Sequence, residues 1–215
     1  MGMDKNTQSL MNIKLEKTKE ALLKNNMDAR ILENQDEVLK VMQSIIEKNA
    51  RVSVGGSQTL FECGVIDALR EMDIQYEDRY QEGLTREEME VIYHNAFTCD
   101  YYVASSNAVT MNGELYNVDG TGNRVAAMTY GPKHVILIVG QNKIVSDIKE
   151  AKERVESIAA PANNLRLNKP NACTFAGKCI DCKSDTRICA TYVTHAHQMK
   201  KDRIIVLLVK EDFGY

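Results

Sequence analysis

The chain has 215 residues, of which 44% are hydrophobic and 27% are charged, and its formal net charge is −3. These values fit one substantial globular domain, and the slight negative charge argues against a dedicated nucleic-acid surface. No apolar run approaches the roughly 20 residues that a membrane helix needs. The N-terminus lacks the apolar core of a signal peptide, so a cytoplasmic location is expected.

The N-terminal part predicts helices that alternate with short strands. Apolar residues at helical spacing predict a first helix within residues 1–25. A second helix is expected to begin after Asn34, whose side chain can cap the first turn while Glu37 reaches back. A short strand at residues 51–54 then runs into a glycine-rich loop, and a helical pattern follows over residues 60–69.

The middle of the chain predicts two strands, a helix and a hairpin. One strand is expected at residues 73–77, and Thr85 with Glu88 has the pattern of a capping box that opens a helix. Residues 100–105 predict a buried strand. In residues 109–118 an Asn-Gly pair separates two short strand-like segments, which is the strongest short-range hairpin pattern.

The C-terminal part continues the alternation. A short helix over residues 125–128 precedes an apolar strand at residues 135–139. Asp147 can cap a helix that is expected to end before Pro161, and residues 204–209 return to strand. The pattern predicts an α/β fold with a mostly parallel sheet, helices on both faces and the hairpin as an irregular insert.

The loop after the strand at residues 51–54 has the layout of an anion-binding site. Two glycines let a ligand approach the backbone, and hydroxyl and amide side chains follow as a helix begins. The residues concerned are Gly55, Gly56, Ser57, Gln58 and Thr59. The alternative is an ordinary helix N-cap, which would need only Ser57.

Residues 117–124 carry more polar groups than a turn requires. The candidate ligand-binding residues here are Asp119, Gly120, Thr121, Gly122, Asn123 and Arg124. Arg124 can hold a carboxylate or phosphate with two N–H groups. Asp119 is the candidate catalytic residue, as a base or as an acceptor that orients a hydroxyl; alternatively, it only pairs with Arg124 in a capped turn. Two such loops in one α/β domain favour a small bound anion.

Other polar residues are weaker candidates. Asn107 follows a buried strand at its carboxyl end, where open α/β sheets bind ligands, although a loop amide is an equal alternative. His94 is interpreted as an ordinary helix residue. His195 and His197 are two residues apart and would diverge on a helix, and Glu62 is expected to be solvated.

Four of the six cysteines fall in one C-terminal segment, whereas Cys63 and Cys99 are isolated. The clustered residues are Cys173, Cys179, Cys182 and Cys189. Four thiolates suit tetrahedral zinc or an iron–sulfur cluster, and Lys178, Lys183 and Arg187 would offset their charge. Unmetallated thiols or a redox dithiol at the Cys-x2-Cys pair are the alternatives. We expect a single domain over residues 1–215 with a metal-binding segment at residues 170–200.

Taken together, these motifs resemble the LUD (lactate utilisation) domain family, in particular its small stand-alone members. The resemblance covers nearly the whole chain. Its motifs are GGSQTL at residues 55–60 with Gly64, SNAVT at 106–110, NG at 112–113, NVDGTGNR at 117–124, YGPK at 130–133, GQNK at 140–143 and AAPAN at 159–163.

The resemblance implies a fold like that of ribose-5-phosphate isomerases, glucosamine-phosphate deaminases and CoA transferases, in which a loop like residues 55–59 holds phosphate or carboxylate. It also implies participation in the oxidation of L-lactate to pyruvate beside iron–sulfur partner subunits. It supplies no catalytic role for individual residues. The four-cysteine segment belongs to a subset of the family.

The leading hypothesis is a lactate or 2-hydroxy acid utilisation protein that holds a small anionic metabolite and passes electrons to iron–sulfur subunits. The chain has no full dinucleotide fingerprint, so electrons are expected to pass to a partner or to a cluster at the four cysteines. An iron–sulfur cluster is preferred over zinc there because the resemblance implies partner subunits that carry such clusters. One alternative is sugar-phosphate isomerase or acyl-transfer chemistry, the latter with Glu62 or Glu114 as nucleophile. Another is a non-catalytic assembly or regulatory subunit. A homo-oligomer is a further option.

Overall fold

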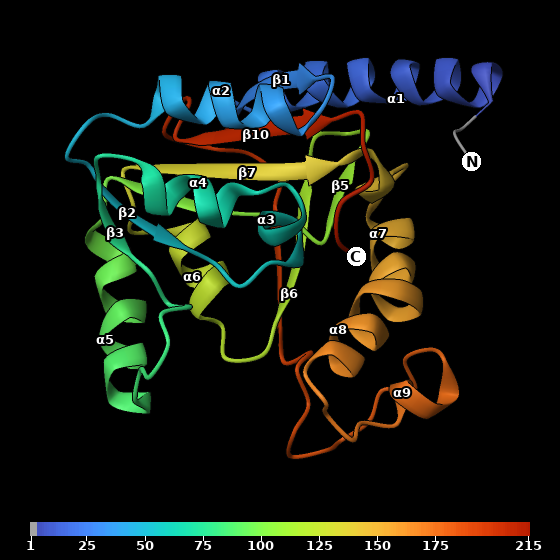
Figure 1. The fold of residues 1–215 in the computed structure, drawn as a ribbon. Coiled ribbons are helices and arrows are strands. Elements are labelled where there is room, and N and C mark those ends of the chain that lie inside the picture. The colour runs from blue at the N-terminus through green and yellow to red at the C-terminus, as the bar shows by residue number, and fades with distance from the viewer. Residues whose placement is uncertain (1–3) are drawn as a thin grey trace.

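A computed structural model describes residues 4–215, and its centre is a six-stranded sheet in which every neighbouring pair of strands is parallel. Helices cover both faces of this sheet (Figure 1). The predicted α/β fold is therefore confirmed. In spatial order the strands are β1 (Asp28–Leu32), β10 (Ile204–Val209), β7 (His134–Gly140), β4 (Tyr101–Ala104), β2 (Arg51–Val54) and β3 (Gln75–Glu77).

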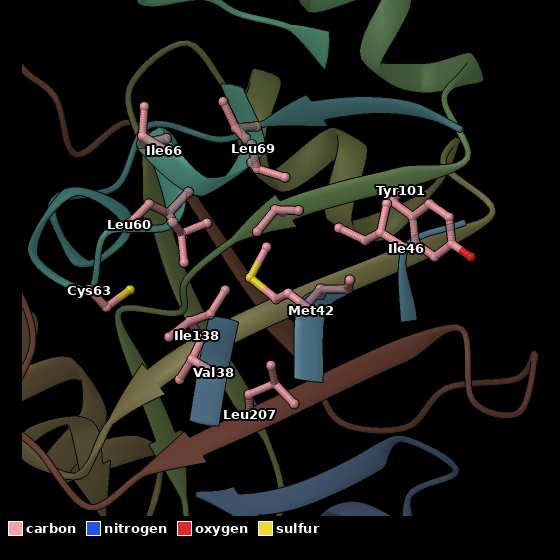
Figure 2. Close-up of a cluster of buried hydrophobic side chains, with 14 of the residues drawn as sticks. Val38, Met42, Ile46, Leu60, Cys63, Ile66, Leu69, Tyr101, Ile138 and Leu207 are labelled. Carbon is pink, nitrogen blue, oxygen red and sulfur yellow. The ribbon is translucent and has the colours of Figure 1, made fainter. Parts of the chain in front are cut away.

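The strands of the sheet send alternate side chains to two separate apolar cores, as a sheet buried on both faces requires. In β7, Ile136 and Ile138 face one core, and Val135, Leu137 and Val139 face the other. The first core packs against α2 (Gln35–Ile45), α3 (Gln58–Glu62) and α4 (Val65–Glu71), and Figure 2 shows its side chains interdigitating. The second packs against α1 (Lys5–Lys24) and α6 (Asn123–Thr129).

A second, four-stranded sheet contains the predicted hairpin. Its spatial order is β8 (Ile144–Val145), β5 (Ala108–Thr110), β6 (Leu115–Asp119) and β9 (Thr191–His195). Strands β5 and β6 pair antiparallel around Gly113, whose φ of 78° is the left-handed conformation that such a turn uses. The hairpin thus lies outside the six-stranded sheet. It pairs with β8 and β9, which follow β7 in the chain.

The helix that follows Asp147 does not end before Pro161, which contradicts the prediction. It runs through α7 (Ile148–Arg154), a π-helical turn (Val155–Ala159) and α8 (Ala160–Arg166), and leads toward the short α9 (Cys173–Ala176) (Figure 1). Pro161 lies in the first turn of α8, where a missing N–H is tolerated, and the wider π turn before it takes up the change in hydrogen bonding. The extension carries the chain toward the cysteine segment.

Smaller differences have local causes. Strand β1 was not predicted, because its five residues do not alternate regularly between buried and exposed side chains. The helical pattern over residues 60–69 is broken at Gly64, whose φ is 69°. Glu37 accepts the N–H of Glu33 at 2.8 Å, one residue before the Asn34 cap. The capping box at Thr85 is confirmed, and it opens α5 (Arg86–Asn95), followed by a 3-10 turn (Ala96–Thr98).

No helix among residues 4–215 is long and apolar enough to cross a membrane.

Candidate anion-binding site

Loops from both sheets converge on one cavity of about 280 Å³. They follow the carboxyl ends of β2, β4, β6 and β7. After β2 the chain continues to β3 at one edge of the sheet, whereas after β4 it continues toward β7 on the other side. Ligands of open α/β sheets bind where neighbouring strands diverge in this way. The topology therefore places the cavity at the expected position for a ligand.

Both predicted loops line this cavity. The sequence-based candidates that line the cavity are Gly56, Ser57, Gln58, Thr59, Asn107, Asp119, Gly120, Thr121, Asn123 and Arg124. Gly55 and Gly122 are not part of the lining. A Cβ on Gly55 would lie 2.9 Å from the Tyr102 hydroxyl, and Gly122 has a φ of 89° directly before α6. These two glycines serve backbone packing and geometry.

Arg124 is buried, and its side chain holds the cavity loops together. Its Nη1 donates to the Ser105 carbonyl at 3.1 Å and to Asn117 Oδ1 at 2.8 Å. Its Nη2 donates to Asn107 Oδ1 at 3.0 Å and to the Val118 carbonyl at 2.9 Å. These four bonds match the four hydrogens of the two terminal nitrogens. Arg124 therefore gives the site positive charge, but its fork is not free to hold a ligand bidentately.

Asp119 is used mainly to organise its own loop. Oδ1 accepts the N–H of Gly120 at 3.0 Å, and Oδ2 accepts the N–H of Val125 at 3.1 Å. The same carboxylate lies 4.0 Å from Nε of Arg124. The second bond caps the first turn of α6. The side chain still lines the cavity, so it can accept one further hydrogen bond from a ligand hydroxyl.

Lys143 is a site residue that the sequence-based candidates missed. It follows β7 in a 3-10 turn (Gln141–Lys143), lines the cavity and is only 3% exposed. Its Nζ donates to Thr59 Oγ1 at 2.7 Å and to Ser105 Oγ at 3.1 Å. Burial, with repulsion from Arg154 and Arg124, lowers the pKa of Lys143 to about 7. Its only sequence signal is its place in the GQNK motif.

Two further arginines, which sequence reasoning also missed, lie in the cavity wall. Arg79 donates from Nη2 to the Tyr93 hydroxyl at 2.7 Å, and its guanidinium carbon is 4.7 Å from the centre of that ring. Arg166 lies at the end of α8. Among the described residues 4–215, the lining thus contains four basic side chains, with Arg124 and Lys143, and one side-chain carboxylate, that of Asp119. The cavity therefore favours an anion.

The four clustered cysteines line a second, smaller cavity. Ile188 belongs to the walls of both cavities, and its Cα would lie 3.4 Å from a Cβ on Gly120. The N–H of Ala190 donates to the Asp119 carbonyl at 2.9 Å, so the chain that leaves the cysteines is bonded to the ligand loop. The cysteine segment is thus a neighbour of the anion cavity.

The cysteine segment fits a thiophilic metal in part. The N–H of Asp181 donates to Cys179 Sγ at 3.4 Å, and Arg187 donates to the carbonyls of Cys182 and Cys189. Burial and the charge of neighbouring cysteines raise the pKa of Cys189 to about 11 and raise that of Cys173, a repulsion that a cation would relieve. Within residues 4–215, no three His, Cys, Asp or Glu side chains are close enough to hold a metal. The sulfurs would have to draw together to bind one.

The remaining candidates lie outside the anion cavity. His94 is exposed on α5, as expected. His195 contacts Thr129 and His197 contacts Asn26, so the two rings have separate surroundings. Burial and nearby arginines lower the pKa of His195 to about 4.

The two glutamates considered for acyl transfer are engaged elsewhere. Glu62 accepts the N–H of Gly214 at 2.5 Å, and Glu114 accepts the hydroxyl of Thr110 at 2.9 Å. Neither lines the cavity.

Comparison with known proteins agrees with this fold. The profile of the LUD domain matches residues 15–209, which is most of the chain. The chain belongs to the LUD domain family. A crystal structure of a DUF162 family protein from Deinococcus radiodurans superimposes with a TM-score of 0.52 at 14% identity, over 93% of this chain and 97% of that one. At this identity the likeness supports the fold alone. No curated protein matches the LUD chain significantly.

Proposed function

We propose that this LUD protein binds a small carboxylate or phosphate metabolite, and that it serves the utilisation of lactate or a related 2-hydroxy acid. The observation that carries the proposal is the convergence of two glycine-containing loops and four basic side chains on one cavity. LUD domains are associated with lactate utilisation, which directs the proposal to hydroxy acids.

The residues have separate roles in this proposal. Backbone N–H groups of residues 56–59 and the cations of Arg79 and Arg166 attract the anionic group. Arg124 fixes the loops, and Asp119 accepts a hydrogen bond from the ligand hydroxyl. Oxidation of the hydroxy acid to the 2-oxo acid would release two electrons and two protons, and iron–sulfur subunits of a partner would supply the electron acceptor.

We further propose that the cysteine segment holds a metal group, preferably an iron–sulfur cluster and otherwise zinc. A cluster would exchange single electrons, whereas zinc would only brace the segment. The wall at Ile188, shared with the anion cavity, supports a role next to the ligand.

Substitution of Arg79 tests the ligand site. We expect Arg79→Ala to weaken binding of L-lactate or inorganic phosphate about tenfold, because a charge-assisted hydrogen bond contributes roughly 1.5 kcal/mol or more. Isothermal titration calorimetry measures this change. Lys149→Ala is the matched control, because Lys149 is an exposed cation that does not line the cavity, with a side chain 86% exposed. Equal affinities for the two variants and the unsubstituted protein would remove Arg79 from the site.

Anaerobic purification tests the metal group. We expect about one thiophilic centre per chain by elemental analysis, with visible thiolate-to-iron absorbance if it is an iron–sulfur cluster. Replacing Cys179 and Cys182 by serine should abolish metal retention, whereas Cys63→Ser should leave it unchanged, because Cys63 is buried in the core cluster against α3 and α4. A metal-free protein that resists reconstitution would contradict this part of the proposal.

The second candidate is a non-catalytic assembly or regulatory subunit. It is favoured by Asp119, whose two oxygens already accept backbone N–H groups, and by the exposed Phe175 and Ile180 beside the cysteines. Turnover of hydroxy acids with an artificial electron acceptor separates the two. Ligand binding without turnover, together with co-purification of an iron–sulfur protein, would support the subunit.

A further inference from the structure

The Lys143 nitrogen has one tetrahedral position without a hydrogen-bond partner in the protein. Its nitrogen bears Cε and donates to the hydroxyls of Thr59 and Ser105. Among residues 4–215, no carboxylate lies within ion-pair distance of this nitrogen. In the uncharged amine, both hydrogens are then engaged and the fourth tetrahedral position is the lone pair. Because Lys143 lines the cavity, this position is available to a bound ligand.

The surroundings lower the pKa of this amine to about 7, so a large fraction of it is uncharged at neutral pH. The side chain is 3% exposed, and the guanidinium groups of Arg124 and Arg154 repel a positive charge on it. A lysine desolvated beside other cations is the usual arrangement of a nucleophilic amine. Arg79 and Arg166, which also line the cavity, supply positive charge that attracts the carboxylate of a ligand.

We propose that Lys143 forms a reversible imine with the carbonyl carbon of a small 2-oxo acid held in the cavity. The inference rests on the proposed anion binding, and it adds a covalent step and a substrate class to it. The Nζ lone pair forms a C–N bond while the carbonyl C–O π bond breaks to give a carbinolamine. One amine proton moves to the oxygen as the carbinolamine forms, and loss of its hydroxyl with the remaining N–H proton as water gives the neutral imine, with no net oxidation or reduction. The hydroxyls of Thr59 and Ser105 lie where they can relay these protons.

Reductive trapping tests the proposal. The full chain is incubated with pyruvate and sodium cyanoborohydride near pH 7, digested, and mapped by mass spectrometry. We expect the reduced adduct on Lys143, enriched roughly a hundredfold or more over solvent-exposed lysines, which are almost wholly protonated at this pH. Excess L-lactate, which has no ketone, should protect Lys143 by competing for the cavity.

Two variants separate covalent chemistry from anion binding. Lys143→Arg has no primary amine, so it should form no adduct, and pyruvate that it binds in calorimetry is held without a covalent step. Lys149→Ala should be trapped like the unsubstituted chain. Pyruvate binding without a Lys143 adduct would overturn the imine and leave the proposed function standing. Absence of any anion binding would overturn both, and equal labelling of exposed lysines would overturn the imine.

Discussion

Arg124→Ala is expected to destabilise the fold by about 3–5 kcal/mol, because truncation removes four hydrogen bonds that a buried guanidinium donates. The guanidinium satisfies the carbonyls of Ser105 and Val118 and the side-chain oxygens of Asn107 and Asn117. These acceptors come from the loop of residues 105–107 and from strand β6, which the guanidinium joins. Urea unfolding, followed by circular dichroism, measures the loss.

Two comparisons make this expectation specific. Arg124→Lys should recover little, because one ammonium cannot reach four acceptors in a fork geometry. Arg166→Ala removes another cation from the cavity wall, but its side chain donates to Asn163 on its own helix and holds no separate segments together as Arg124 does, so it should cost less than about 1 kcal/mol. If Arg124→Ala is as stable as Arg166→Ala, the organising role assigned to Arg124 is wrong.

The fold was predictable where local sequence determines structure. The capping box at Thr85, the Asn34 cap and the turn at Gly113 each depend on a few adjacent residues. The apolar strand at residues 204–209 was also found with its observed bounds. The failures have longer-range causes. The helix continues through Pro161 because of a π turn, which no residue pattern predicts. Strand β1 is stabilised by pairing with β10, which lies far away in the sequence.

The same division explains what was missed in the site. The glycine-containing loops can be recognised from their composition, and both line the cavity. Lys143 and Arg79 are ordinary basic residues in sequence, and only the folded chain places them beside Thr59 and Gly56. Arg124 was recognised as a cation, but its four protein acceptors lie in segments that only folding brings together. A role in organising loops is therefore harder to predict than a role in binding.

Lys143→Met is expected to change how stability depends on pH. Burial holds the pKa of Lys143 at about 7 in the folded chain, below its value in the unfolded chain. Between these two values the unfolded chain binds more protons, so the free energy of unfolding rises with pH by up to about 1.4 kcal/mol per unit. Burial of Lys143 therefore lowers the free energy of unfolding most at and below neutral pH.

Because methionine does not titrate, Lys143→Met should lack this contribution. Its stability relative to the unsubstituted chain should be highest near pH 6 and should fall steadily as the pH rises from 7 to 9. Urea unfolding of both proteins at these pH values measures the difference, and Lys149→Ala, in which an exposed lysine is removed, should show no such trend. A constant difference would mean that Lys143 keeps its proton in the folded chain. The amine would then have no lone pair for a carbonyl, and the imine would fail together with the pH dependence.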